Sequence, residues 1–339
     1  MIEETTTGAS PDPAPKRADD LADENLRPSD LSSYIGQPNV KQQVSILIES
    51  AKKRKSFADH ILIHGLPGLG KTSLAQVIAS ELGVGITITS GQAIDKTGDA
   101  AALLSNIKKN DVLFIDEIHR LKPKVEEMFY TAMEDFAIDI VLGKGPTARS
   151  MRLDVPKFTL VGATTQINKM ASPMRDRFGC VLKLDYYSEE EVAEIIGMNA
   201  PKLDVDIVDE AVARLACSSR KTPRIANRLL RRVRDYAVVH NEDVATLDLV
   251  EKALDALGVD EHGLDPTDLN ILNAIHYDFD GGPVGLSTLS AALSEEKESL
   301  ENVYEPYLMQ LGLLQRSQRG RLLTEKGIRF VKLKRSDKN

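Results

Sequence analysis

The chain has 339 residues and a formal net charge of −8, and 42% of its residues are hydrophobic while 28% are charged. This composition is typical of a globular protein that is long enough for two or three domains. No apolar run reaches the roughly 18 residues that would span a membrane, and the first residues lack the apolar core of a signal peptide. We therefore expect a cytoplasmic protein with no membrane partner.

Cysteine, tryptophan and charge narrow the function classes further. Cys180 and Cys217 do not have the spacing of metal ligands, and we expect them to be reduced thiols and not a disulfide. Trp is absent, which gives no support for stacking on carbohydrate. The negative net charge argues against indiscriminate coating of nucleic acid, but it leaves local phosphate contacts open.

Order is predicted to begin after an N-terminal tail. Residues 1 to about 25 are rich in Thr, Pro, Ala, Asp and Glu and have no apolar periodicity, which predicts disorder. Residues 40–53 have the apolar spacing of a helix. A short apolar strand at 61–64 leads into a glycine-rich loop, and a helix over 71–82 follows, ending at Gly83, a residue that commonly terminates helices.

Strands and helices then alternate along the chain. The predicted elements are strands at 84–89, 112–115 and 159–161, helices at 100–108 and 128–136, and a β-hairpin over 138–153 with a turn at 143–146. Such alternation predicts an α/β fold, with a parallel sheet that is covered by helices on both faces.

The rest of the chain predicts two smaller units. Residues 188 to about 256 have a purely helical pattern, and 260–263 are a plausible linker. From residue 265 the pattern predicts three helices followed by a hairpin over 313–323, an order that suits a winged helix. Basic residues outnumber acidic ones from residue 313 onward. This basic end is either a solvated tail or a local footprint for nucleic acid.

The glycine-rich loop, residues 65–72, has the pattern GxxxxGKT. Its glycines let backbone N–H groups surround phosphate oxygens at the start of a helix, whose dipole favours an anion. Lys71 would reach the β- and γ-phosphates, and the Thr72 hydroxyl would ligate Mg²⁺. The required strand and helix flank the loop, so we predict that the chain binds ATP with Mg²⁺.

Two acidic residues follow the apolar strand at 112–115. Asp116 lies where it can hold Mg²⁺ through water, and Glu117 can polarise the attacking water. The alternative is that the two residues only cap the next helix. Together with the glycine-rich loop, the pair predicts ATP hydrolysis.

Several longer motifs carry a family resemblance. They are residues 116–120 (DEIHR), 132–136 (AMEDF), 162–165 (GATT), 175–179 (RDRFG), 222–232 (TPRIANRLLRR) and 281–286 (GGPVGL). In this order they resemble RuvB, a family of bacterial AAA+ motors that drive branch migration of Holliday junctions with RuvA. The resemblance runs from about Leu26 to Arg321. It implies an AAA+ ATPase domain over 26–187, an all-helical lid domain over 188–260 and a DNA-binding winged helix over 261–339.

The resemblance also implies roles for single residues. Thr165 would be the first sensor of the γ-phosphate, and Arg224 would be the second, carried by the lid. Arg177 would be an arginine finger that reaches into a neighbouring subunit, with Arg175 as its competitor. The implied catalytic set is Lys71, Asp116, Glu117, Thr165, Arg177 and Arg224, with Thr72 and Asp116 at the metal. The implied nucleotide-binding set is Leu26, Arg27, Tyr34, Ile35, Gly68, Gly70, Lys71, Thr72, Ser73, Glu134, Asp135, Phe136, Arg177, Tyr187 and Arg224.

The partners implied by the resemblance are DNA, RuvA, RuvC and further copies of the chain. The family acts as a hexameric ring on duplex and four-way junction DNA, without regard to sequence, in recombination and repair. RuvA would bind the hairpin over 138–153, although this hairpin could instead be buried between subunits. RuvC would serve resolution of the junction.

The wing is the predicted DNA contact. Arg316, Arg319 and Arg321 belong to its hairpin, and Lys297 is a further candidate. The candidate recognition helix, 298–310, is acidic, so we expect contacts to backbone phosphates more than base readout. A winged helix used only for protein contact stays an alternative.

Two rival functions remain, and particular features of the sequence argue against each of them. A clamp-loader type ATPase would share the sensors but not the GGPVGL segment. A nucleotide-switched transcription regulator would need a basic recognition helix.

A few positions depart from the family pattern. They are Leu66, Gln166, Lys221, Lys297 and the pair Ser317–Gln318. None removes a catalytic group, but Gln166 and Lys221 are expected to affect communication between subunits.

Overall fold

A computed structural model describes residues 25–142 and 149–336 of the protein. The predicted disordered tail, up to residue 24, and the predicted turn at 143–146 lie outside the described residues. Among the described residues, no helix is both long and apolar enough to cross a membrane. Cys180 and Cys217 are not joined to each other.

A five-stranded parallel sheet forms the centre of the first domain. Its strands lie in the order β2 (Ile86–Ser90), β3 (Val112–Asp116), β6 (Thr159–Thr164), β1 (Ile61–His64) and β7 (Cys180–Lys183). Successive side chains of a strand point to opposite faces. In β3, Val112 and Phe114 accordingly join one apolar core, while Leu113 and Ile115 join another.

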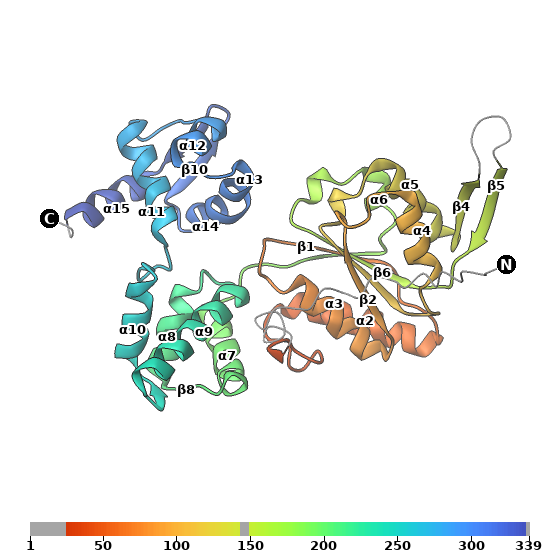
Figure 1. The fold of residues 1–339 in the computed structure, drawn as a ribbon, viewed down its shortest axis with the longest axis horizontal. Helices are drawn as coiled ribbons and strands as arrows, with labels where there is room; N and C mark the ends of the chain where they lie inside the picture. The colour runs from red at the N-terminus through yellow and green to blue at the C-terminus, as the bar shows by residue number, and fades with distance from the viewer. Residues whose placement is uncertain (1–24, 143–148, 337–339) are drawn as a thin grey trace, which may run out of the picture.

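Helices cover both faces of the sheet, as the alternating pattern predicted (Figure 1). The helices α2 (Pro38–Arg54) and α3 (Lys71–Leu82) pack on one face, and α4 (Thr97–Ser105), α5 (Pro123–Glu134) and the short α6 (Ser172–Arg175) pack on the other. The α/β fold is therefore confirmed.

Some element boundaries differ from the prediction. The strand β1 and the helix α3 have the predicted bounds, because glycines follow the strand and flank the helix. The helix α5 begins five residues before the predicted 128, at Pro123 in its first turn, where proline is tolerated. The bounds of the strand β2 and the helix α4 are displaced by one to three residues from the predicted 84–89 and 100–108.

The predicted hairpin forms a separate antiparallel pair, β4 (Ala137–Leu142) with β5 (Arg149–Asp154). It extends from the side of the sheet domain that faces away from the lid (Figure 1). Ile138 is buried and Ile140 packs against the core beneath the hairpin, whereas Met151 is exposed. The base of the hairpin is thus part of the domain's own core.

The lid contains α7 (Glu189–Asn199), α8 (Asp209–Ser218), α9 (Pro223–His240) and α10 (Leu247–Ala256). The prediction of a purely helical unit is wrong in one detail. The loops before α8 and α10 pair as two short parallel strands, β8 (Asp206–Ile207) and β9 (Val244–Ala245). Two-residue strands are too short to leave an alternating apolar pattern.

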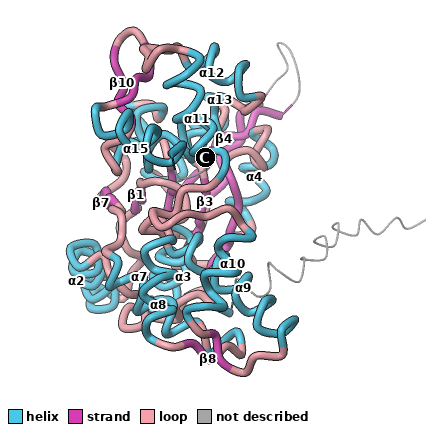
Figure 2. The backbone as a smooth tube through the Cα atoms, turned by 90° about the vertical axis from the view of Figure 1, so that its left-hand side faces the viewer, coloured by secondary structure: helices cyan, strands magenta, loops and turns pink. Residues whose placement is uncertain are grey.

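The C-terminal unit is a winged helix built on a third core. Its elements are α11 (Pro266–Asn273), a π-helical turn (Ala274–Asp278), α12 (Leu286–Leu293), α13 (Lys297–Ser299), a second π-helical turn (Leu300–Tyr304), α14 (Glu305–Gln310), β10 (Leu314–Ser317), β11 (Gly320–Leu323) and α15 (Glu325–Ser336). The candidate recognition helix is therefore three short pieces. Figures 1 and 2 show the lid and the winged helix on the same side of the sheet domain.

The helix α15 was not predicted, because its sequence suggested only a basic tail. Val331 is buried in the winged-helix core, and Ile328 and Phe330 pack against it. Gly327 lets the helix approach the backbone closely, since a Cβ at this position would lie 2.1 Å from the carbonyl oxygen of Leu313. Charged residues between these apolar positions obscured the helical stripe.

Candidate nucleotide site

The glycine-rich loop turns tightly between β1 and α3. Gly68 and Gly70 have φ angles of 82° and 90°, which favour glycine. A Cβ on Gly68 would lie 3.1 Å from the Cβ of Arg224, and one on Gly70 would lie 3.3 Å from the hydroxyl of Tyr34. The loop is thus closely flanked by the lid and by the N-terminal segment.

Lys71 is the first residue of α3 and is almost fully buried. Its Nζ donates hydrogen bonds to the carbonyl oxygens of Gly65, at 2.9 Å, and Leu66, at 3.0 Å. Burial lowers the pKa of Lys71, while the nearby carboxylates of Glu117 and Asp116 act in the opposite direction. The loop therefore holds the ammonium group beside the two acidic residues.

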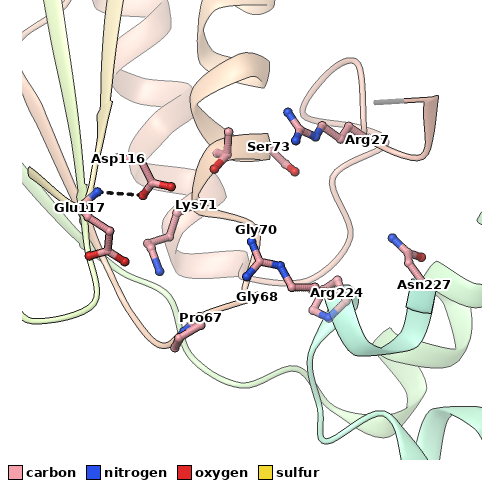
Figure 3. A pocket seen from close by; sticks show the side chains of 12 residues that line it. Arg27, Pro67, Gly68, Gly70, Lys71, Ser73, Asp116, Glu117, Arg224 and Asn227 are labelled. Atoms are coloured by element: carbon pink, nitrogen blue, oxygen red, sulfur yellow. Dashed lines mark hydrogen bonds between the residues drawn. The ribbon is translucent and has the colours of Figure 1, made fainter. Parts of the chain in front are cut away.

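Asp116 ends β3 and faces the same pocket (Figure 3). Its Oδ1 accepts a hydrogen bond from the backbone N–H of Glu117 at 3.0 Å. Burial raises the pKa of Asp116 above its usual value. A partly buried carboxylate next to the Thr72 hydroxyl is an oxygen donor set that fits a hard divalent cation such as Mg²⁺.

Glu117 is held in place by groups from two other segments. Its Oε2 lies 3.0 Å from the donating hydroxyl of Thr165, 3.2 Å from the backbone nitrogen of Thr165 and 3.1 Å from Nδ1 of His119. Burial would raise the pKa of Glu117, but the hydrogen bonds from His119 and Thr165 outweigh it and lower the pKa to about 2. Glu117 makes no capping hydrogen bond to the short helix that follows it.

The pocket around these groups has walls from two domains (Figure 3). It is lined by Arg27, Pro67, Gly68, Gly70, Lys71, Thr72, Ser73, Asp116, Glu117, Pro223, Arg224 and Asn227. The sheet domain supplies the phosphate loop and the carboxylates, while the start of α9 supplies the lid wall. The backbone N–H of Arg224 lies 3.4 Å from the carbonyl oxygen of Gly68. Arg224, the second sensor implied by the resemblance, therefore lies opposite the loop.

A second, more apolar pocket adjoins the loop. It brings together five residues of the implied nucleotide-binding set, namely Leu26, Arg27, Tyr34, Ile35 and Tyr187. The hydroxyl of Tyr187 lies 3.3 Å from the carbonyl oxygen of Leu69 and 3.4 Å from the hydroxyl of Tyr34. An apolar slot beside a phosphate loop suits a planar base.

Some pocket residues escaped the sequence reasoning. Asn227 follows Arg224 by three residues on α9, and its Oδ1 accepts a hydrogen bond from the side chain of Asn199 at 2.9 Å. Helical spacing from Arg224 could have revealed Asn227. His119, which contacts Glu117, could have been found only as the histidine of the DEIHR motif.

Four predicted nucleotide-binding residues do not line either pocket. Arg177 lies over the ring of Tyr130 and donates to a carboxylate oxygen of Glu134 at 3.1 Å. Asp135 pairs with Arg152, and Phe136 packs in an aromatic cluster. Arg177, Glu134, Asp135 and Phe136 thus belong to a separate face of the sheet domain.

The competitor of Arg177 and one departing residue also have defined positions. Arg175 donates to the hydroxyl of Ser172 at 3.0 Å. Gln166, directly after Thr165, donates from Nε2 to Oδ1 of Asn302 in the winged helix at 3.0 Å. Gln166 therefore links the sensor segment to the winged helix within one chain.

A parallel sheet, a phosphate loop with paired acidic residues and a helical lid that closes over it together define an AAA+ ATPase. The comparisons identify its family. The family model described as "Holliday junction DNA helicase RuvB P-loop domain" matches residues 26–184, the "RuvB AAA lid domain" matches 187–260 and the "RuvB C-terminal winged helix domain" matches 261–332. The chain belongs to the RuvB family.

Solved structures agree with this assignment. The Thermotoga maritima RuvB Holliday junction branch migration motor is 47% identical, with a TM-score of 0.83, over 91% of this chain and 98% of that one. A point mutant of Thermotoga maritima RuvB is 48% identical, with a TM-score of 0.84, over 91% and 98% of the two chains. The protein is accordingly an ATP hydrolase, a P-loop motor of the helicase type.

Proposed function

We propose that this chain is the ATP-driven motor of Holliday junction branch migration and acts as a hexameric ring on duplex DNA. The observation that carries the proposal is the position of Arg177. Its guanidinium lies outside the pocket formed by its own Lys71, Glu117 and Arg224. An arginine finger at this position would act in the site of a neighbouring copy, and this supports the proposal of an assembly.

The site residues have complementary tasks in hydrolysis. Lys71 and the α3 N-terminus would bind the phosphates. Glu117, held by the hydroxyl of Thr165, keeps its negative charge and would polarise the attacking water. Arg224, which belongs to the lid, would neutralise negative charge on the phosphates. Arg177 of a neighbouring copy would neutralise the rest. Thr72 and Asp116 would hold Mg²⁺, which supplies further positive charge at the transferring phosphoryl group.

The partners follow from the other two regions. We propose that the wing contacts the phosphates of duplex and four-way junction DNA without sequence preference. The hairpin over 138–153 is the proposed site for RuvA, and RuvC would resolve the junction. Ile140 packs against the core, so the exposed Met151 is the better position at which to disturb RuvA binding.

The test is branch migration of a synthetic four-way junction with purified RuvA, ATP and this protein. Lys71→Ala and Arg177→Ala should each be inactive, with turnover lowered by about 10³-fold or more for the finger. A mixture of the two variants should recover activity, because mixed rings contain interfaces with an intact Lys71 and an intact Arg177. Arg175→Ala is the matched control and should stay active.

Two outcomes would overturn the proposal. If the wild type hydrolyses ATP but does not migrate the junction, the motor function is wrong. If the mixture stays as inactive as its parts while native mass shows mixed assemblies, Arg177 does not act between subunits.

A further inference from the structure

One buried cation joins the lid to the winged helix. Arg220 lies between α8 and α9 and is 5% exposed. Its backbone has a φ of 49°, in the left-handed region that non-glycine residues seldom adopt. Burial of a charge and an unusual backbone conformation both cost free energy, so the surrounding contacts must favour this arrangement.

The partners of Arg220 all lie in the linker and the winged helix. Its Nε donates to the carbonyl oxygen of Gly263 at 2.8 Å, and Nη2 lies 2.7 Å from Oδ2 of Asp265 and 2.5 Å from Oδ2 of Asp268. The guanidinium also lies 5.6 Å from the ring centroid of Tyr307. One side chain from the lid thus contacts two helices of the winged helix.

The two carboxylates that accept from Arg220 are held by further hydrogen bonds. Asp265 and Asp268 form the capping box of α11, in which each carboxylate accepts a backbone N–H from the other residue. Asp268 is fully buried, and burial raises its pKa to about 7 while Arg220 acts in the opposite direction. The guanidinium of Arg220 therefore contacts α11 through the two residues that cap this helix.

The linker packs just as closely on the lid. A Cβ on Gly263, whose φ is 74°, would lie 2.5 Å from the carbonyl oxygen of Ser218. The two chain segments consequently meet without an intervening side chain. Any rotation of the winged helix against the lid must break this contact and the bonds of Arg220.

On its other side, Arg220 is four residues from Arg224. The carbonyl oxygen of Lys221 accepts a hydrogen bond from the N–H of Tyr187, at 3.1 Å, beside the nucleotide pocket. Thr222 is held by its N–H and by its hydroxyl to the carbonyl oxygen of Ser219, and it precedes α9. The short segment 220–224 therefore connects the contacts of the winged helix with the phosphate loop, and hydrogen bonds fix the backbone between them.

We propose that Arg220 is a positioning residue that couples the winged helix to Arg224, so that duplex DNA and nucleotide alter each other's binding through the segment 220–224. This inference rests on the proposed function, because it takes the winged helix to be the DNA-binding unit. Coupling between two binding sites is reciprocal: the factor by which nucleotide changes DNA affinity equals the factor by which DNA changes nucleotide affinity.

The test measures that factor in the full-length protein. Duplex affinity is measured by fluorescence anisotropy with and without a non-hydrolysable ATP analogue, together with the kcat and KM of the ATPase with and without duplex. In Arg220→Gln the analogue should no longer change duplex affinity, whereas the wild type should show at least about a 5-fold change, the lower end of usual coupling factors. Affinity for duplex without nucleotide should stay within about 2-fold, because no wing residue is altered.

Three further variants keep the proposal testable. Arg234→Gln removes an ion pair with Asp235 that lies within α9, away from the linker, and it should leave the coupling intact. Arg220→Lys should restore part of the coupling, since it keeps the charge without the forked geometry. Asp268→Asn breaks the same contact from the winged helix, and it should lower coupling even if Arg220→Gln does not fold.

The outcomes separate the two proposals. A wild type without coupling between nucleotide and duplex contradicts the proposed function. A coupled wild type with Arg220→Gln and Asp268→Asn equally coupled overturns the role of Arg220 and leaves the proposed function standing.

Discussion

The nucleotide pocket and the wing are both rich in charge, but their charges face different partners. In the pocket, the side chain of Arg224 forms no hydrogen bond or ion pair within the described residues, and Lys71 donates only to backbone carbonyls. In the wing, Arg316 and Arg321 both bind the fully buried carboxylate of Glu305, at 2.6 and 2.7 Å. Arg224 can thus neutralise the charge of a ligand, whereas Arg316 and Arg321 neutralise a buried carboxylate of the chain itself.

The predicted DNA contacts of the winged helix include both kinds of residue. Arg319 in the wing and Lys297 on α13 are exposed, and neither side chain forms a hydrogen bond or an ion pair within the described residues. Arg316 and Arg321 stay predicted DNA contacts, but their contact with Glu305 gives them a structural task as well. The comparison therefore divides the four predicted DNA-binding residues into two pairs.

The largest expected effect is on stability, in the variant Arg316→Ala with Arg321→Ala. It leaves Glu305 buried without a cation, and such a loss costs about 3–5 kcal/mol. Urea unfolding followed by circular dichroism should show this loss, with Arg319→Ala as the control within about 0.5 kcal/mol of the wild type. If the double variant is as stable as the control, the two arginines do not maintain the fold.

The next largest effect is on turnover, in Arg224→Ala. Losing one charge-stabilising donor lowers kcat by about 10²-fold, which corresponds to about 2.7 kcal/mol. Because this side chain has no internal partner, the free energy of unfolding should change by less than about 0.5 kcal/mol. Steady-state ATPase assays measure kcat, and urea unfolding measures the stability. A destabilised variant with normal kcat would mean that Arg224 maintains the fold and does not act on the nucleotide.

Local signals predicted the nucleotide site well. Glycines mark the loop from Gly65 to Gly70, and an apolar strand places Asp116 and Glu117 at its end. The roles of Arg224 and Tyr187 came from longer motifs, and the structure places both at the pocket. The residues of the phosphate loop were easy to locate because such a loop needs particular residues close together in sequence.

Long-range contacts could not be predicted in the same way. Arg220 and Asp268 are 48 positions apart, and their contact depends on how the lid packs on the winged helix. Arg321 and Glu305 lie on different elements that a hairpin brings together. The basic residues of the wing therefore suggested either a solvated surface or DNA contact, since nothing in the sequence indicated their buried acceptor.

The smallest effect is expected at the exposed pair of the winged helix, Lys297 on α13 and Arg319 in the wing, in the variant Lys297→Ala with Arg319→Ala. Each lost phosphate contact reduces the slope of log affinity against log salt by about 1, so the double variant should lose about 2. Duplexes of unrelated sequence should weaken equally, because phosphate contacts carry no base information. Anisotropy titrations between low and physiological salt measure this slope. An unchanged slope with normal stability would mean that the DNA contact lies elsewhere, and the division of the wing into fold-maintaining and DNA-facing cations would then fail.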